Sequence, residues 1–380
     1  MSAKPLSAWC HEHLDELLDD LSVLVGHESP STGKALLDTT ADWIEGWLHD
    51  RLGPPAEWTR RAQEGYGDVL EATYPGTAGK PVLLIGHYDT VWPEGTLAGW
   101  PFTLQGGTAT GPGVYDMKAG LVTGVWALRA LRALNLPHPT VTFVFNGDEE
   151  LGSPVSRRHI ENAARDRAAA LVLEPGIGWD VKTERKGVGT FTVSTTGIES
   201  HAGNEPAEGA SAVHALAEIV GQLAAAADPG AGTTINVGTI EGGTARNVIA
   251  GRARCLVDIR ITQQAEADRI DQVLHDLRPA DPRVTVAVTG EWSRPPLRLT
   301  PESKALFDLA DEVACDLRGP LEPISVGGGS DANFLAALGV PVLDGLGSSG
   351  AGAHARHEHV VVDVIPDRVA LVAGLLTRLG

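Results

Sequence analysis

Short apolar runs alternate with longer stretches of helical spacing over the first half of the chain. Leucine and valine recur at helical spacing over residues 7–26, which predicts a single helix there. Strands that alternate with helices and are apolar on both faces predict an α/β fold with a mostly parallel sheet sandwiched by helices. The other predicted strands and helices of this half are strands 68–74, 81–86, 140–146 and 169–173, and helices ending near residues 52, 134 and 165.

The pattern changes near residue 184. Residues 186–196 alternate as a half-exposed strand does, and residues 206–227 form an alanine-rich stretch of helical spacing. The order βαββαβ predicts a two-layer sandwich, and about 110 residues is a suitable size for an inserted domain. The remaining elements of this sandwich are strands 233–240, 252–261 and 284–288, and helix 265–277.

The α/β pattern returns after the predicted sandwich. A helix is expected at residues 301–317, a glycine-rich loop at 327–331 opens another, and a strand at 340–343 precedes a last helix from residue 366. The chain therefore divides into residues 1–183 with 296–380, which share one sheet, and residues 184–295, which are inserted between them.

Composition narrows the kind of protein. A formal net charge of -19 argues against nucleic acid and anionic membranes as partners. The sequence has no apolar run long enough to cross a membrane, and its first 21 residues read as an acidic amphipathic helix. Cys10, Cys255 and Cys315 are too few and too widely spaced for a disulfide framework or a cysteine zinc site, so a reduced, cytoplasmic setting is expected.

Polar residues with metal-binding side chains follow several of the predicted strands. In an open α/β sheet the carboxyl ends of parallel strands meet at one rim, so these side chains are expected to converge there. Each has a simpler alternative, because residues 148–150 could be a solvated acidic turn and Glu174 could simply end a strand. A coincidence across all of them is harder to accept. The residues are His87, Asp89, Asp116, Glu149, Glu150 and Glu174.

Carboxylates crowded at one rim repel each other and take up protons unless divalent cations hold them ionised. One histidine with several carboxylates suits zinc or another borderline metal, and too few neutral oxygens are present for calcium. The donors suffice for two ions about 3.5–4 Å apart that share a bridging carboxylate. Because Glu149 and Glu150 are adjacent, they point in different directions, so one could bind metal while the other acts as a general base.

Four short motifs now support a family resemblance over nearly the whole chain. They are residues 86–91, 116–120, 148–153 and 328–332, in this order. The chain resembles the zinc-dependent exopeptidase and deacylase family that contains the glutamate carboxypeptidases, the aminoacylases and succinyl-diaminopimelate desuccinylase. The resemblance implies a catalytic domain of residues 1–183 and 296–380, with residues 184–295 as an inserted lid and dimerisation domain.

The resemblance also implies a set of metal ligands. Asp116 would bridge two Zn²⁺ ions, for which Co²⁺ or Mn²⁺ could substitute. His87 and Glu174 would complete one site, and Glu150 and His354 would complete the other.

The choice of His354 rests on spacing. Residues 354–359 contain three histidines, and a polar loop is the simpler explanation for most of them. His354 is preferred over His357 and His359 because its distance from Glu358 resembles the His-x-x-x-Glu pattern of the family.

Catalytic roles follow from the same resemblance. Glu149 would be the general base and then the general acid, and Asp89 would orient His87. Residues 197–203 resemble the lid motif of the family, whose histidine stabilises an oxyanion, often in the site of the partner subunit. That histidine is His201 here, for which a surface turn is the alternative.

Further residues would bind substrate. Asn247 and Arg294 match lid segments of the family, and Arg294 suits a free carboxylate because its guanidinium can donate two parallel hydrogen bonds. Arg260 is a weaker candidate. Gly328 belongs to the loop that opens a helix, where backbone N–H groups favour an anion.

Two segments indicate the branch of the family. Residues 111–113 and 100–102 look most like the glutamate carboxypeptidases. We therefore expect a homodimeric exopeptidase that cleaves an amide bond next to a free α-carboxylate, in a small peptide or an N-acyl amino acid. The alternatives are an N-acyl-amino-acid deacylase of the aminoacylase or desuccinylase type and, in another class, an inactive metal-dependent scaffold that binds carboxylates.

Overall fold

A computed structural model describes residues 2–380, which form two compact units. The larger unit contains residues up to 184, 299–326 and 330–380, and the smaller unit contains residues 185–298 and 327–329. Within residues 2–380, none of the helices is both long and apolar enough to cross a membrane. The three cysteines are free thiols, as the sequence predicts.

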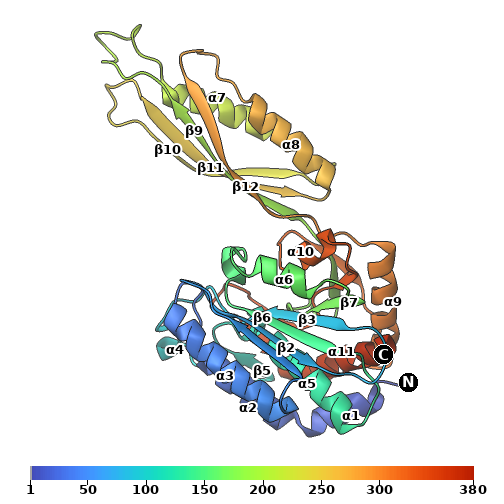
Figure 1. The fold of residues 1–380 in the computed structure, drawn as a ribbon. Helices are drawn as coiled ribbons and strands as arrows, with labels where there is room; N and C mark the ends of the chain where they lie inside the picture. The colour runs from blue at the N-terminus through green and yellow to red at the C-terminus, as the bar shows by residue number, and fades with distance from the viewer. Residues whose placement is uncertain (1) are drawn as a thin grey trace. The chain divides into compact units, whose positions relative to one another are not determined.

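The larger unit is built on a six-stranded sheet with the order β1-β2-β6-β3-β7-β14 (Figure 1). Strands β6, β3, β7 and β14 are parallel, whereas β2 runs antiparallel to β6 and β1 antiparallel to β2. Every residue of β3 and β6 is buried, so these strands form the middle of the sheet. The strands are β1 Glu57–Arg61, β2 Val69–Tyr74, β3 Val82–His87, β6 Val141–Asn146, β7 Ala169–Val172 and β14 Val342–Leu343.

Helices flank this sheet and confirm the predicted α/β fold. Helix α5 packs against α1, α2, α3 and α11, and α6 packs against α10 beside β6 and β7. Apolar side chains of these helices and strands, Trp126 and Phe143 among them, form one large core. The helices are α1 Lys4–Glu12, α2 Leu14–Gly26, α3 Lys34–Leu52, α4 Thr96–Gly99, α5 Ala119–Ala133, α6 Arg157–Ala163, α9 Pro301–Cys315, α10 Ala332–Ala337 and α11 Ile365–Leu379.

The single helix predicted for residues 7–26 is wrong, because His13 separates α1 from α2. The His13 backbone has φ -108° and ψ 16°, outside the helical region. Its ring stacks on Trp9 with a centroid distance of 4.0 Å, and its Nδ1 lies 2.8 Å from the Trp9 carbonyl oxygen. These local contacts favour a break that apolar spacing alone does not reveal.

Two small sheets and three short helical turns complete the larger unit. One sheet has the order β15-β16-β5-β4, and in another β13 pairs with β8. Neither the β4–β5 hairpin nor β1 was predicted, because their short polar segments lack an apolar pattern. The strands are β4 Thr103–Gln105, β5 Thr108–Thr110, β8 Val181–Arg185, β13 Pro323–Val326, β15 Gly350–Ala351 and β16 His359–Val361, and the short helical turns are Val114–Lys118, Glu149–Leu151 and Val362–Val364.

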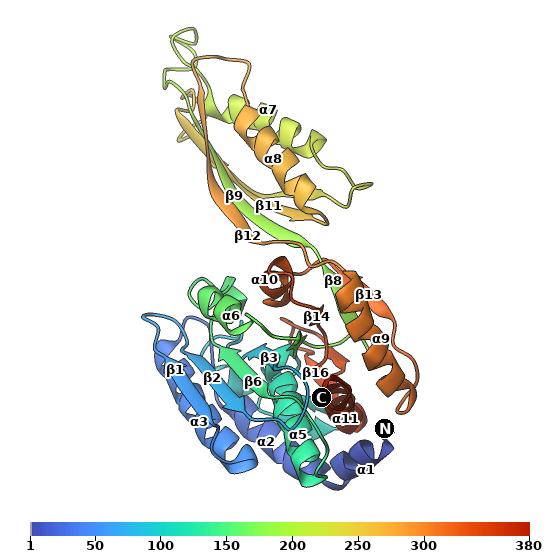
Figure 2. The same cartoon turned by 45° about the vertical axis from the view of Figure 1, so that its right-hand side comes forward.

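The smaller unit follows the order βαββαβ and has the antiparallel sheet β10-β11-β9-β12 (Figure 2). Helices α7 and α8 cover one face, and buried and exposed residues alternate along β11 accordingly. Helix α7 begins at residue 212, six residues later than predicted, where Ser211 Oγ accepts a bond from the His214 N–H. The elements are β9 Gly187–Thr196, α7 Ala212–Ala225, β10 Thr234–Gly242, β11 Arg252–Ile261, α8 Gln264–Asp276 and β12 Thr285–Arg294.

Candidate metal centre

The rim at the carboxyl ends of the parallel strands collects four of the predicted ligand-type side chains. His87 is the last residue of β3, Glu149 and Glu150 lie in the turn after β6, and Glu174 follows β7. Because β6, β3 and β7 are adjacent and parallel, their ends deliver these side chains to one place. Asp116 differs from the expectation: it comes from the turn Val114–Lys118 ahead of α5 and not from the end of a strand in this sheet.

Asp116 lies between two histidines. Its Oδ1 is 3.4 Å from His87 Nε2, and its Oδ2 is 3.4 Å from His354 Nε2. A different carboxylate stands beyond each histidine: Glu174 Oε1 is 3.6 Å from His87 Nε2, and Glu150 Oε2 is 3.1 Å from His354 Nε2. The five side chains predicted as ligands therefore form two halves that share one carboxylate.

The protonation of these groups shows how strongly they depend on one another. Burial opposes ionisation of Asp116, but the imidazoles of His354 and His87 hold its pKa well below the usual range. Hydrogen bonds to Asp116 and Glu150 raise the pKa of His354 to about 10. Burial lowers the pKa of His87, but the surrounding carboxylates outweigh burial and raise that pKa well above its ordinary value. The carboxylates therefore favour the protonated form of both histidines.

Divalent cations fit this cluster better than protons do. Burial raises the pKa of Glu150 to about 7 despite its bond with His354, and its Oε1 is buried without a hydrogen-bond partner. A buried carboxylate oxygen without a partner is costly, and a metal ion would satisfy it. Donor atoms of His87, Asp116 and Glu150 all lie within 4.8 Å of one another. Imidazole and carboxylate donors suit zinc and similar metals.

Glu149 stands beside the cluster. Its carboxylate oxygen lies within 4.8 Å of donor atoms of both His87 and Glu174, so distance alone would also allow it to bind metal. Its side chain is less buried than that of His87 and opens from the same turn as Glu150. Glu149 is thus partly accessible to solvent.

Asp89 connects β3 to the turn with the two glutamates. Its carboxylate is fully buried and accepts the backbone N–H groups of Glu149 and Glu150, each at 3.2 Å, and the Ser31 hydroxyl at 2.7 Å. His87 Nδ1 lies 3.0 Å from the Asp89 backbone oxygen and 3.4 Å from Oδ1. The ring is thus oriented mainly by the backbone of Asp89, while its carboxylate fixes the glutamate turn.

His354 is the histidine of residues 354–359 that faces the carboxylates. Its φ of 60° lies in the left-handed region, which side chains disfavour. The loop around it is held by bonds from the Ala355 N–H to the Gly352 oxygen and from the Glu358 N–H to the Ala355 oxygen, both at 2.9 Å. His359 Nδ1 instead lies 2.9 Å from the His357 carbonyl oxygen.

Several nearby residues were not identified from the sequence. Lys182 Nζ lies 4.0 Å from Glu174 Oε2, and the Tyr115 hydroxyl donates a bond of 2.6 Å to the Gly176 carbonyl. No motif marks Lys182 or Tyr115. Glu358 is buried. In the sequence it only indicates which histidine is the candidate ligand, although its spacing from His354 is also a signal that Glu358 has a role of its own.

In the smaller unit the two lid segments lie side by side. His201 forms a bridge with Val248, and the Asn247 carbonyl accepts the Ala202 N–H at 3.0 Å. His201 is exposed, and its Nδ1 accepts the N–H groups of residues 203 and 204 at 3.2 and 3.0 Å. In the neutral ring Nε2 therefore carries the hydrogen and can donate it.

The other predicted substrate residues have different surroundings. Arg294, at the end of β12, is buried, and a β-carbon at Gly329 would come within 2.6 Å of its Cδ. The Arg260 guanidinium forms two bonds of 2.8 Å with Asp258 on its own strand. The Gly328 carbonyl accepts from Arg185 at 3.2 Å, and α10 is only six residues long, which weakens the argument for an anion site at its start.

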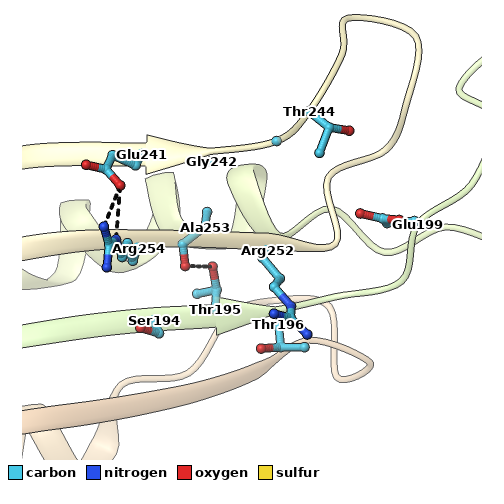
Figure 3. A pocket seen from close by; sticks show the side chains of 11 residues that line it. Ser194, Thr195, Thr196, Glu199, Glu241, Gly242, Thr244, Arg252, Ala253 and Arg254 are labelled. Atoms are coloured by element: carbon cyan, nitrogen blue, oxygen red, sulfur yellow. Dashed lines mark hydrogen bonds and ion pairs between the residues drawn. The ribbon is translucent and has the colours of Figure 1, made fainter.

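A cavity of about 420 Å³ lies at one end of the smaller unit's sheet (Figure 3). It is lined by residues of β9, β10 and β11, and the bond between the Thr195 hydroxyl and the Ala253 oxygen joins two of these strands. Arg254 is paired with Glu241 at 2.8 Å, whereas Arg252 lies beside Thr196 on the neighbouring strand. None of the predicted substrate residues is among its lining residues.

The larger unit thus has a mostly parallel sheet with histidine and carboxylate donors at its rim, and its chain is interrupted by a smaller unit with an antiparallel sheet. Donors of this kind could hold a metal ion. The sequence pattern of Peptidase family M20/M25/M40 matches residues 83–378. The chain therefore belongs to this family and is a hydrolytic enzyme.

Two curated relatives and one solved structure illustrate the similarity. Carboxypeptidase G2 of Pseudomonas sp. (strain RS-16) is 31% identical over 371 residues, covering 96% of this chain and 89% of the relative. Succinyl-diaminopimelate desuccinylase of Xanthomonas oryzae pv. oryzae (strain PXO99A) is 31% identical over 337 residues, covering 83% and 88%. The YXEP protein of Bacillus subtilis, described as a dinuclear metal binding peptidase of family M20, superposes with a TM-score of 0.72 at 15% identity, covering 97% and 98%.

Proposed function

We propose that this protein is a two-zinc hydrolase that cleaves an amide bond next to a free α-carboxylate. The observation that carries the proposal is the position of Asp116, whose two oxygens each face a different histidine at 3.4 Å. A carboxylate placed in this way suits a bridge between two cations. The similarity to a carboxypeptidase and to a dinuclear metal binding peptidase supports the same function.

The five candidate ligands would be divided between two metal positions. His87 and Glu174 would hold one cation, Glu150 and His354 the other, and Asp116 both. When bound, two such cations polarise a carbonyl group and lower the pKa of a water molecule.

Glu149 is the proton carrier in this proposal. Its carboxylate takes a proton from the attacking water and later delivers it to the nitrogen of the leaving amine. The turn that holds it is anchored through the bond from its own backbone N–H to Asp89. Asp89 therefore positions the base without taking part in proton transfer.

The smaller unit would contribute substrate contacts. His201 can donate from Nε2 to the developing oxyanion, because its Nδ1 is engaged with the backbone. Asn247 lies in the segment paired with that of His201 and would bind the same part of the substrate. Arg294 would bind the free carboxylate of the substrate, and Arg260 and Gly328 are secondary candidates.

Substrate kinetics test the reaction. With zinc-loaded protein, we expect dipeptides with a free C-terminal carboxylate to be cleaved, and their C-terminal amides to be cleaved at least about 10²-fold more slowly in kcat/KM, because a neutral amide offers Arg294 neither a negative charge nor a second acceptor oxygen. The panel should include N-acetyl, N-succinyl and N-aroyl amino acids. Equal rates for acid and amide would contradict the carboxylate requirement.

The similarity to a desuccinylase supports a second candidate, an N-acyl-amino-acid deacylase. Its chemistry at the metal centre would be the same, and only the pocket for the acyl group would differ. A preference for N-acyl amino acids over dipeptides in the same panel would favour it. Zinc-replete protein that binds these compounds and cleaves none would favour the inactive scaffold.

A homodimer formed through the smaller unit is proposed as well. Strand β10 is an edge of its sheet and is largely exposed, so its unpaired backbone groups can pair with a second copy. If His201 acts in the partner's site, mixing inactive His201→Ala and Glu149→Ala chains should restore activity, to about a quarter of wild type after random exchange. Light scattering checks the dimer. A mixture that stays inactive despite exchange would show that His201 does not act in the partner's site.

A further inference from the structure

Glu358 is a buried carboxylate that the proposed reaction does not use. Its side chain is 1% exposed and accepts four N–H groups. Oε1 accepts from the backbone of Tyr115 at 2.9 Å and of Asp116 at 3.1 Å. Oε2 accepts from the Trp92 indole at 2.8 Å and from the backbone of Gly113 at 3.1 Å. All four donors converge on one carboxylate.

Three of these donors belong to one short turn. The turn from Gly113 to Asp116 carries the carboxylate that faces both histidines, and its N–H groups at 113, 115 and 116 all bond Glu358. Gly113 has a φ of 71°, and a β-carbon there would come within 2.4 Å of Thr90 Cγ2. The turn can therefore adopt few conformations, and the bonds to Glu358 stabilise the one observed.

The same residue also holds the loop of His354. The Glu358 N–H donates to the Ala355 oxygen at 2.9 Å, which closes the chain directly after His354. Glu358 thus bonds to the backbone near two candidate ligands that are more than 200 residues apart in sequence. Its side chain accepts the Asp116 N–H, and its main-chain N–H donates to the loop of His354.

We propose that Glu358 is a positioning residue that holds Asp116 and His354 at the separation required for a shared metal site. The inference rests on the two-metal function proposed above and names the residue that preorganises it. Glu358 contacts no substrate in this role. Its effect passes through the main chain of the turn 113–116.

Glu358→Gln is the sharpest variant, because glutamine has the same shape. Its single side-chain oxygen can accept two of the four N–H groups, and its NH₂ group must then face the other two donors whichever way the amide turns. Two buried donors lose their acceptor, and the turn should rearrange. We expect the dissociation constant for zinc to rise about 10- to 100-fold.

Zinc affinity is measured by competition with a chromophoric chelator. A matched control is Glu28→Gln, since the Glu28 carboxylate accepts the N–H groups of Gly95 and Leu97 at 2.7 and 2.8 Å at the start of α4, which carries no candidate ligand. Trp92→Phe removes the indole donor and leaves the three backbone donors to Glu358, and it keeps an aromatic ring next to Trp100 and Arg356. Both controls should bind zinc with nearly wild-type affinity, and wild-type affinity in Glu358→Gln would overturn the proposal.

A second measurement does not depend on metal. In metal-free wild-type protein, hydrogen exchange of the peptide covering residues 113–118 should be slow, because its N–H groups are bonded to a buried carboxylate. The same peptide should exchange about 10-fold faster or more in Glu358→Gln, which is the effect of losing roughly one such bond. Rapid exchange in the wild type would overturn the positioning role even if two metals bind, whereas slow exchange in a protein that binds no zinc would reject only the metal proposal.

Discussion

Glu149→Ala is expected to lower kcat by about 10²- to 10⁴-fold while the protein still binds two zinc ions per chain. The side chain carries the proton in the proposed reaction. The other carboxylates of this turn are committed elsewhere, because Asp148 is buried and accepts the N–H groups of Val155 and Ser156, and Glu150 would bind metal. The backbone bond from residue 149 to Asp89 does not involve the side chain, so the turn and the neighbouring Glu150 should stay in place.

This result is checked by steady-state kinetics together with the zinc content of the same sample. Glu161→Ala is a suitable control, because Glu161 lies on α6 and pairs with Arg157 at the surface. A variant at Glu149 with near-normal kcat would reject the mechanism. Loss of one zinc ion would instead make Glu149 a ligand, a role that its distance to His87 and Glu174 permits.

Asp116→Asn is expected to have the largest effect on metal binding. Asparagine keeps the shape of the side chain but loses the negative charge and one of the two oxygens that face His87 and His354. Both metal positions share this group, so the zinc affinity of both should fall. The loss should exceed the roughly 10- to 100-fold that is typical when a residue that only hydrogen-bonds a ligand is replaced. Activity should fall with metal content.

Equilibrium dialysis against zinc measures this loss. Asp20→Asn is the matched control, since Asp20 is also buried and accepts from Trp126 and Arg51 on helices that carry no candidate ligand. This control should lower thermal stability while leaving zinc binding unchanged. An Asp116→Asn protein that still binds two zinc ions tightly would show that Asp116 is not the bridge.

The sequence predicts those parts of the fold that depend on local pattern. Strand β3 is six buried residues long and reads as an apolar run, and β11 alternates because one of its faces is covered. The break at His13 could not be predicted in this way, because a ring stacked on Trp9 leaves the apolar spacing of the helix intact.

The candidate site also has parts that the sequence pattern predicts and parts that it does not. His87, Glu150 and Glu174 could be placed together because each follows a strand of one parallel sheet. The position of Asp116 could not be derived from strands, and only the resemblance to a family assigned it a shared role. The bonds of Glu358 to the turn 113–116 could not be predicted, because they join segments far apart in sequence.

Anomalous diffraction at the zinc edge from crystals of zinc-loaded protein tests the two-metal site most directly. We predict two peaks about 3.5–4 Å apart on either side of the Asp116 carboxylate. One should lie against His87 and Glu174, and the other against Glu150 and His354. A single peak, or two peaks that do not share Asp116, would contradict the proposed function.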